Sequence, residues 1–139
     1  MEDSSINFTV DGEVVPWKRP RFNGKTKAIF EKAEVKEYKD KVITAYKESG
    51  GRYFEKDVPL IFELCVFMGV PKSLSLKKRL NLITEKRPTK RPDNDNLYKG
   101  IADALNGIAY YDDSQIVTTS ISKFWSANPH AEITIREIK

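Results

Sequence analysis

The sequence predicts a single α+β domain spanning residues 1–139, with helices packed on a mixed β-sheet. A length of 139 residues fits one hydrophobic core and leaves no room for a second of useful size. Alternating apolar patterns, which are typical of strands, occur near both ends and in the middle of the chain. Segments with the spacing of amphipathic helices lie between them, so strands and helices belong to the same domain.

The first third of the chain predicts a strand, a loop and a helix. Apolar and polar residues alternate over residues 6–10, and the turn signal Asp11-Gly12 allows this strand to continue as half of a hairpin. Residues 16–27 are basic and interrupted by prolines, which indicates a loop. Apolar residues at helical spacing predict a helix over about residues 31–49, ended by Gly50-Gly51.

The middle third predicts a buried strand and a short helix. Residues 60–70 are apolar on both alternating faces, which predicts a central strand buried on both sides, with Cys65 in the core. A short amphipathic helix follows, with Ser73 or Ser75 as its N-cap. A basic loop over residues 84–92 then leads to the last third of the chain.

The last third predicts one helix and two strands. The helix covers about residues 95–106, with Asp95 as a plausible N-cap and Gly107 closing it. One strand begins near Val117, and alternation over residues 131–136 predicts the other.

Composition excludes several classes of protein. With 40% apolar and 11% aromatic residues the chain is not disordered, and no run of about 18 apolar residues is present to span a membrane. The acidic, polar start is unlike a signal peptide, and a reducing cytoplasm is the simplest expected compartment. One cysteine and one histidine exclude a disulfide framework and a cysteine zinc site, and make a histidine triad improbable. Catalysis here must therefore use carboxylates, lysines or hydroxyls.

The net charge of +4 is unevenly distributed. Six basic residues fall within residues 17–32 and eight within residues 72–91, whereas residues 93–113 contain five aspartates and a single lysine. Basic flanks around an acidic centre suit a polyanion held over a cation site. A solvated surface explains the same distribution without any partner.

The acidic centre forms one side of the predicted helix over residues 95–106. At about 100° per residue, the apolar side chains gather on one side and the opposite side presents Asp95, Asn96, Lys99 and Asp103. Asp93 and Asp95 are spaced so that an extended segment places both carboxylates on one side. Turn and cap formation explains an isolated pair of this kind equally well.

A second acidic pair, Asp112-Asp113, follows a short and rather apolar loop over residues 107–111. The loop either returns one of these carboxylates to the start of the helix or leaves the pair in a solvent-exposed turn. Three converging carboxylates make a hard-oxygen site suited to Mg²⁺ or Mn²⁺. Lys99 on the same side either contacts a phosphate or forms an ion pair with Asp95.

These residues resemble the core signature of the RusA family of Holliday junction resolvases, which are often encoded in phages and prophages. The signature comprises RPDNDNL-x-K at residues 91–99, DALNG at 103–107 and DDSQI at 112–116, three parts at fixed spacing. Weaker similarity covers the basic run at residues 16–22 and the segment at residues 71–79. The resemblance extends from about Val15 to the last strand.

The resemblance implies a homodimeric, Mg²⁺-dependent endodeoxyribonuclease that makes paired incisions in four-way DNA, with Mn²⁺ as a plausible substitute ion. It implies three catalytic aspartates that hold the metal and one catalytic lysine, matching Asp93, Asp95, Asp113 and Lys99. Supporting positions match Asn96, Asp103 and Asp112. One departure concerns the residue before the first aspartate, which is basic in the best-known form of the family and is Pro92 here.

The basic segments are the predicted DNA contacts: Lys18, Arg19, Arg21, Lys77, Lys78, Lys90 and Arg91. Trp17 and Phe22 lie among them and either stack on an exposed base or pack the loop itself. Two other functions stay open on the sequence alone. One is a non-catalytic protein that binds branched DNA, and the other is a related nuclease that acts on flaps or forks.

Overall fold

The computed structural model describes residues 5–19, 21–24, 28–30 and 32–138. The predicted basic positions Lys25 and Lys27 and the predicted helix start at Glu31 lie outside the described residues, as do the side chains of Arg21 and Phe22. None of the helices in the described ranges is long and apolar enough to cross a membrane.

A four-stranded mixed sheet forms the centre of the fold, in the order β1-β6-β4-β5. Its strands are β1 (Ile6–Asp11), β4 (Leu60–Gly69), β5 (Ile116–Ser126) and β6 (His130–Glu137). β5 runs parallel to β4, whereas β6 is antiparallel to both β4 and β1. The α+β class with a mixed sheet is therefore confirmed.

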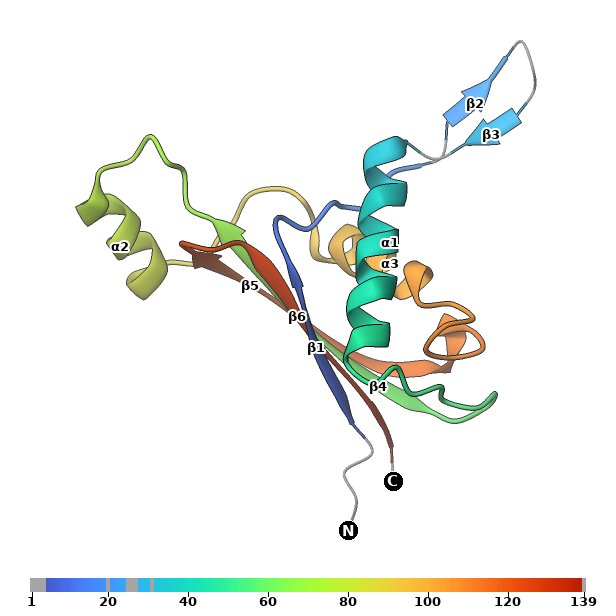
Figure 1. Cartoon of the computed structure of the whole chain (residues 1–139). Coiled ribbons are helices and arrows are strands. Elements are labelled where there is room, and N and C mark those ends of the chain that lie inside the picture. Colours follow the sequence, from blue (N-terminus) through green and yellow to red (C-terminus); the bar gives the residue numbers. More distant parts are fainter. Residues whose placement is uncertain (1–4, 20, 25–27, 31, 139) are drawn as a thin grey trace.

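Two helices cover one face of this sheet, α1 (Ala33–Glu48) and α3 (Asn94–Ala104), as Figure 1 shows. The third helix, α2 (Leu76–Glu85), projects away from them and buries none of its residues. Ser75 caps α2 by accepting a hydrogen bond from the Lys78 amide, so one of the two predicted caps is confirmed.

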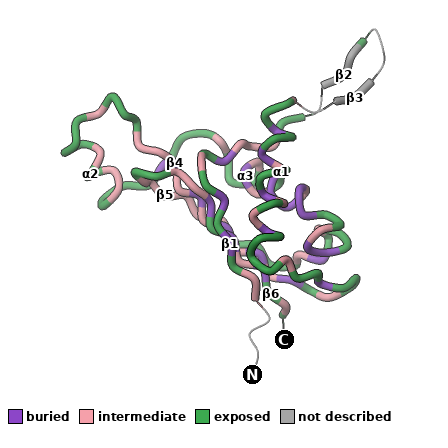
Figure 2. The backbone as a smooth tube through the Cα atoms, viewed as in Figure 1, coloured by how far each residue is buried: buried purple, intermediate pink, exposed green. Residues whose placement is uncertain are grey.

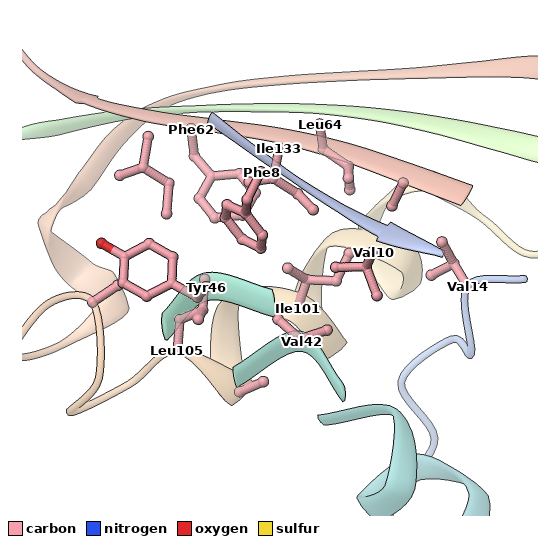
Figure 3. Packing of buried hydrophobic residues seen from close by; sticks show 14 of the residues in the cluster. Phe8, Val10, Val14, Val42, Tyr46, Phe62, Leu64, Ile101, Leu105 and Ile133 are labelled. Atoms are coloured by element: carbon pink, nitrogen blue, oxygen red, sulfur yellow. The ribbon is translucent and has the colours of Figure 1, made fainter. Parts of the chain in front are cut away.

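The core lies between the sheet and the two covering helices. Buried and half-buried residues alternate along β4 (Figure 2). The buried ones belong to one cluster with side chains of α1 and α3. Phe62 of β4 and Ile133 of β6 point toward side chains of α1 and α3, among them Tyr46 and Ile101 (Figure 3). α3 thus has one apolar side fixed in the core, which leaves its other side for polar groups.

Three local predictions differ from the structure. The predicted loop contains a short hairpin of β2 (Arg21–Asn23) and β3 (Ala28–Phe30). Asn23-Gly24 is a turn signal for this hairpin, but the basic residues around it favoured a loop interpretation. β1 pairs with the C-terminal strand β6 instead of continuing as a hairpin. Helix α3 begins one residue earlier than predicted, with Asp93 rather than Asp95 at its N-cap position.

The prediction that β4 is buried on both faces is also wrong. The helices cover only one face of the sheet, so the residues on the opposite side of β4, Cys65 included, are half-buried rather than core. On that open face Phe67 stacks between Phe124 and His130, with ring centroids 5.0 and 4.3 Å away. Apolar residues in both registers of the strand therefore reflect this aromatic cluster and not a second helix layer.

Candidate functional site

The polar side of α3 carries most of the predicted site. Leu97 and Ile101 are buried in the core, while Asp95 and Lys99 are exposed and Asp103 is half-buried. This is the division of the helix that the spacing of its apolar residues predicts.

Asp93 and Asp95 lie together at the N-terminal end of α3. Asp93 occupies the N-cap position in an extended conformation, and its carbonyl accepts the first helical hydrogen bond from Leu97 at 3.1 Å. The Asp93 side chain does not cap the helix, so its exposed carboxylate is not used in holding the helix end. Both carboxylates are also placed favourably toward the positive end of the helix dipole.

Two further acidic residues, Asp103 and Asp113, lie toward the C-terminal end of α3. Asp113 begins a short 3₁₀ helix, η1 (Asp113–Gln115), and its amide donates to the Asn106 side chain at 2.8 Å. The carboxyl group of Asp113 lies close enough to that of Asp103 to influence its protonation. Burial raises the pKa of the Asp103 carboxyl, and the contact with Asp113 raises this pKa further.

The structure therefore does not gather Asp93, Asp95 and Asp113 at one point. Asp103, the partner of Asp113, follows Asp95 by eight residues, which corresponds to about 12 Å along a helix axis. Within the described ranges, no group of three or more histidine, cysteine, aspartate and glutamate side chains is placed to hold a metal ion. The assignment of the three aspartates as metal ligands stays a prediction.

Asp112 stabilises the loop by capping the short 3₁₀ helix η1. Its carboxylate accepts a hydrogen bond from the Ser114 amide at 3.1 Å, and it forms a capping box with Gln115. Hydrogen bonds from Ser114 lower the pKa of the Asp112 carboxyl. Of the two interpretations of the Asp112-Asp113 pair, the turn explains Asp112, while Asp113 turns toward α3.

Sequence reasoning missed Gln115, the side chain that organises this loop. Its carbonyl oxygen accepts from the amides of Tyr111 and Asp112 at 2.9 and 3.1 Å. Its amide nitrogen donates to the carbonyls of Glu55 and Val58 at 2.8 and 3.1 Å. The spacing of Asp112 and Gln115 is the capping-box pattern, which is the sequence signal that points to this role.

The basic N-terminal segment lies against α3. The Trp17 amide donates to the Asn96 carbonyl at 2.9 Å, and the Lys99 ammonium lies 3.9 Å from the centre of the Trp17 indole ring. A Cβ atom at the buried Gly100 would come within 3.5 Å of the Trp17 backbone nitrogen, which shows how closely the segment approaches the helix. Lys99 thus contacts an aromatic ring of this segment.

A pocket of about 380 Å³ opens between this segment and the start of α3. Its wall comprises Pro16, Trp17, Lys18, Arg91, Pro92, Asp93 and Asn96. The exposed Lys18 side chain pairs with Glu34 of α1 at 2.5 Å. The pocket brings an aromatic ring and two cations beside the predicted catalytic carboxylate of Asp93.

The predicted DNA-binding residues fall into three groups. Lys18 and Arg91 are exposed on the wall of the pocket at the start of α3, and their chain neighbours Arg19 and Lys90 are exposed too. Lys77 and Lys78 are exposed on α2, the projecting helix in Figure 1. The backbone of Arg21 lies in the β2–β3 hairpin beyond the end of α1. Of these residues, Lys18 and Arg91 line the pocket that contains Asp93.

Lys123 of β5 is a second residue that sequence reasoning did not identify. Its ammonium group donates to the carbonyls of Lys90 and Pro92, at 2.8 and 3.1 Å, directly before Asp93. No local sequence pattern predicts this contact, because the carbonyls that Lys123 binds lie about 30 residues earlier in the chain.

Comparisons with known proteins find a family model and relatives that match this chain. The family model described as Endodeoxyribonuclease RusA matches residues 11–136. The chain is 39% identical to YqaN of Bacillus subtilis (strain 168), over 96% of each chain. It is 37% identical to the crossover junction endodeoxyribonuclease rusA of Lactococcus phage r1t, over 61% of this chain and 60% of that protein.

Proposed function

The chain belongs to the RusA family of endodeoxyribonucleases, and we propose that it is a Mg²⁺-dependent nuclease that resolves four-way DNA junctions by paired hydrolysis of phosphodiesters. The family signature and the name of the phage relative, a crossover junction endodeoxyribonuclease, support this substrate. The observation that carries the proposal is the polar side of α3, where Asp93 shares a pocket with Lys18 and Arg91 and where Lys99 contacts Trp17 of the same pocket.

The donor groups fit a divalent cation. The nearby Asp113 carboxyl raises the pKa of Asp103, and like charges this close favour either a shared proton or a bound cation. Carboxylate oxygens are the ligands that Mg²⁺ and Mn²⁺ prefer. We propose Asp93, Asp95 and Asp113 as the residues that would hold the ion, with Asp103 supporting Asp113; this assignment rests on the family signature and not on their positions in this structure.

A bound Mg²⁺ supplies Lewis-acid activation of the phosphodiester and of a water nucleophile. The residues of the chain supply position and charge. Lys99 lies over Trp17, and its flexible side chain can turn the ammonium toward the phosphate and stabilise the negative charge that develops there. Lys18 and Arg91 on the pocket wall attract the DNA backbone toward Asp93.

Two symmetric cuts in a four-way junction need two sites related by a two-fold axis, which a homodimer provides. We therefore propose that the active form is a homodimer, as the family implies. Sedimentation analysis of the full chain, alone and with junction DNA, tests this assembly.

The experiment for the proposed function compares substrates under one salt concentration, because phosphate contacts make binding strongly salt-dependent. The full chain is incubated with a synthetic four-way junction, a flap, a fork and a linear duplex, in Mg²⁺, in Mn²⁺ and in chelator. The proposal expects paired nicks in the junction alone, and only with a divalent ion. Preferred cutting of flaps or forks would indicate the related nuclease instead. Junction binding without cleavage in any divalent ion would indicate a non-catalytic branched-DNA-binding protein.

A further inference from the structure

We propose that Lys123 is a positioning residue, which fixes the loop before α3 on strand β5 and thereby places the Asp93 carboxylate. The inference rests on the proposed nuclease function and adds to it a residue outside the family signature. Lys123 belongs to β5, an outer strand of the sheet, whereas the loop that it holds precedes α3.

The direction of the Lys123 side chain follows from the sheet register. Lys123 pairs with Val66 of β4, a buried residue on the face that the helices cover. Lys123 therefore points to the side of the sheet where α3 lies, and it is half-buried there. A lysine at this register position needs acceptors for its ammonium protons, because burying an unpaired charge is costly.

The loop before α3 supplies those acceptors. The Lys123 ammonium donates to the Lys90 carbonyl at 2.8 Å and to the Pro92 carbonyl at 3.1 Å. The Pro92 carbonyl belongs to the peptide group that joins Pro92 to Asp93. The charge-assisted hydrogen bond from Lys123 to this peptide group restrains Asp93, the N-cap residue of α3, and so restrains the direction of the Asp93 carboxylate.

Further contacts attach the same loop to the same stretch of β5. Arg87 donates a hydrogen bond to the Lys123 carbonyl at 3.0 Å and places its guanidinium 3.9 Å from the centre of the Phe124 ring. The Lys90 ammonium lies 5.3 Å from the centre of the Trp125 ring. Three consecutive residues of β5 thus hold the loop, and Lys123 alone reaches the peptide that enters Asp93.

These contacts favour a positioning role over a direct DNA contact. Two of the three ammonium protons of Lys123 are used by backbone carbonyls within the protein. A misplacement of about 1 Å in a catalytic group is enough to slow a reaction about a hundredfold. Loss of Lys123 should therefore act on the cleavage step and not on the affinity for DNA.

The test uses the full chain with Lys123→Met, the rescue variant Lys123→Arg and the control Lys47→Met. Lys47 is exposed in the last turn of α1, so its replacement makes the same change in charge away from the loop. Each protein is measured for junction affinity at several salt concentrations and for single-turnover cleavage in Mg²⁺ at saturating enzyme. Amide hydrogen exchange of residues 90–97 reports the order of the loop without reference to activity.

We expect Lys123→Met to cleave the junction about ten- to a hundredfold more slowly than the natural chain. Its junction affinity, and the dependence of that affinity on salt, should equal those of Lys47→Met. Exchange over residues 90–97 should rise, and Lys123→Arg should restore most of the rate because its guanidinium can donate to both carbonyls.

Normal cleavage by Lys123→Met, or unchanged exchange in the loop, overturns the inference. A shallower salt dependence together with weaker binding also overturns it, because that result identifies Lys123 as a phosphate contact. A natural chain that cleaves none of the substrates refutes the proposed function and this inference together. A natural chain that cleaves, beside an unaffected Lys123→Met, refutes this inference alone.

Discussion

Replacing Gln115 with leucine should destabilise the folded chain strongly. The Gln115 side chain is 9% exposed and makes four hydrogen bonds, all to backbone groups of two separate segments. Leucine has a similar volume and no polar atoms, so two amides and two carbonyls lose their partner at once. At about 1 kcal/mol for each hydrogen bond, the loss of unfolding free energy is about 4 kcal/mol.

This loss is a large share of the 5–15 kcal/mol that typically stabilises a domain. Urea unfolding followed by circular dichroism measures it as a lower midpoint at unchanged slope. Gln115→Glu keeps the two acceptor bonds and loses the two donor bonds, so it separates the two halves of the interaction. Val117→Ala is the control, because Val117 is 60% exposed on β5 and its replacement should stay within about 0.5 kcal/mol. If Gln115→Leu costs less than about 1 kcal/mol, the loop does not depend on this amide.

Two further predictions concern the polar side of α3. Lys99→Met should lower the unfolding free energy by no more than about 1 kcal/mol, because its contact with Trp17 is an exposed cation–π pair. The same variant should reduce junction cleavage at least about a hundredfold, and a variant that cuts at the natural rate excludes Lys99 from catalysis. In the folded chain the pKa of the Asp103 carboxyl is raised above its ordinary value of 3.8, so the folded state binds this proton more tightly than the unfolded state does. The protonated carboxyl therefore adds to the stability of the fold at low pH, and this addition is lost as the pH rises through the raised pKa. With a chelator present, the unfolding free energy of Asp103→Asn minus that of the natural chain should therefore be more favourable to the variant at pH 7 than at pH 3. An equal difference at both pH values contradicts this prediction.

The fold was predictable where local patterns decide it. The division of α3 into an apolar and a polar side follows from the spacing of Leu97, Ile101 and Leu105, and the structure confirms it. The Ser75 cap is likewise a local signal that the structure confirms. These features depend on residues within one or two helical turns, which is the range over which sequence patterns are informative.

The features that sequence reasoning missed depend on contacts between distant segments. The loop after α3 was predicted either to return an aspartate to the start of the helix or to leave it in solvent. Gln115 instead fixes the loop to residues 55–58, and this anchoring places Asp113 beside Asp103. Lys123 reads locally as a polar residue of an outer strand, and only the pairing of β5 with β4 turns it toward α3.

Asp95→Asn tests most directly whether the acidic groups of α3 catalyse the cleavage of DNA. The variant is compared with the natural chain and with Asp40→Asn, an equivalent change at an exposed position of α1. Paired cleavage of a four-way junction in Mg²⁺ is measured beside junction binding at the same salt concentration. We predict that Asp95→Asn binds the junction as well as or better than the natural chain, because one anionic repulsion is removed, and makes no cuts, while Asp40→Asn cuts normally. Normal cutting by Asp95→Asn contradicts a catalytic role for Asp95.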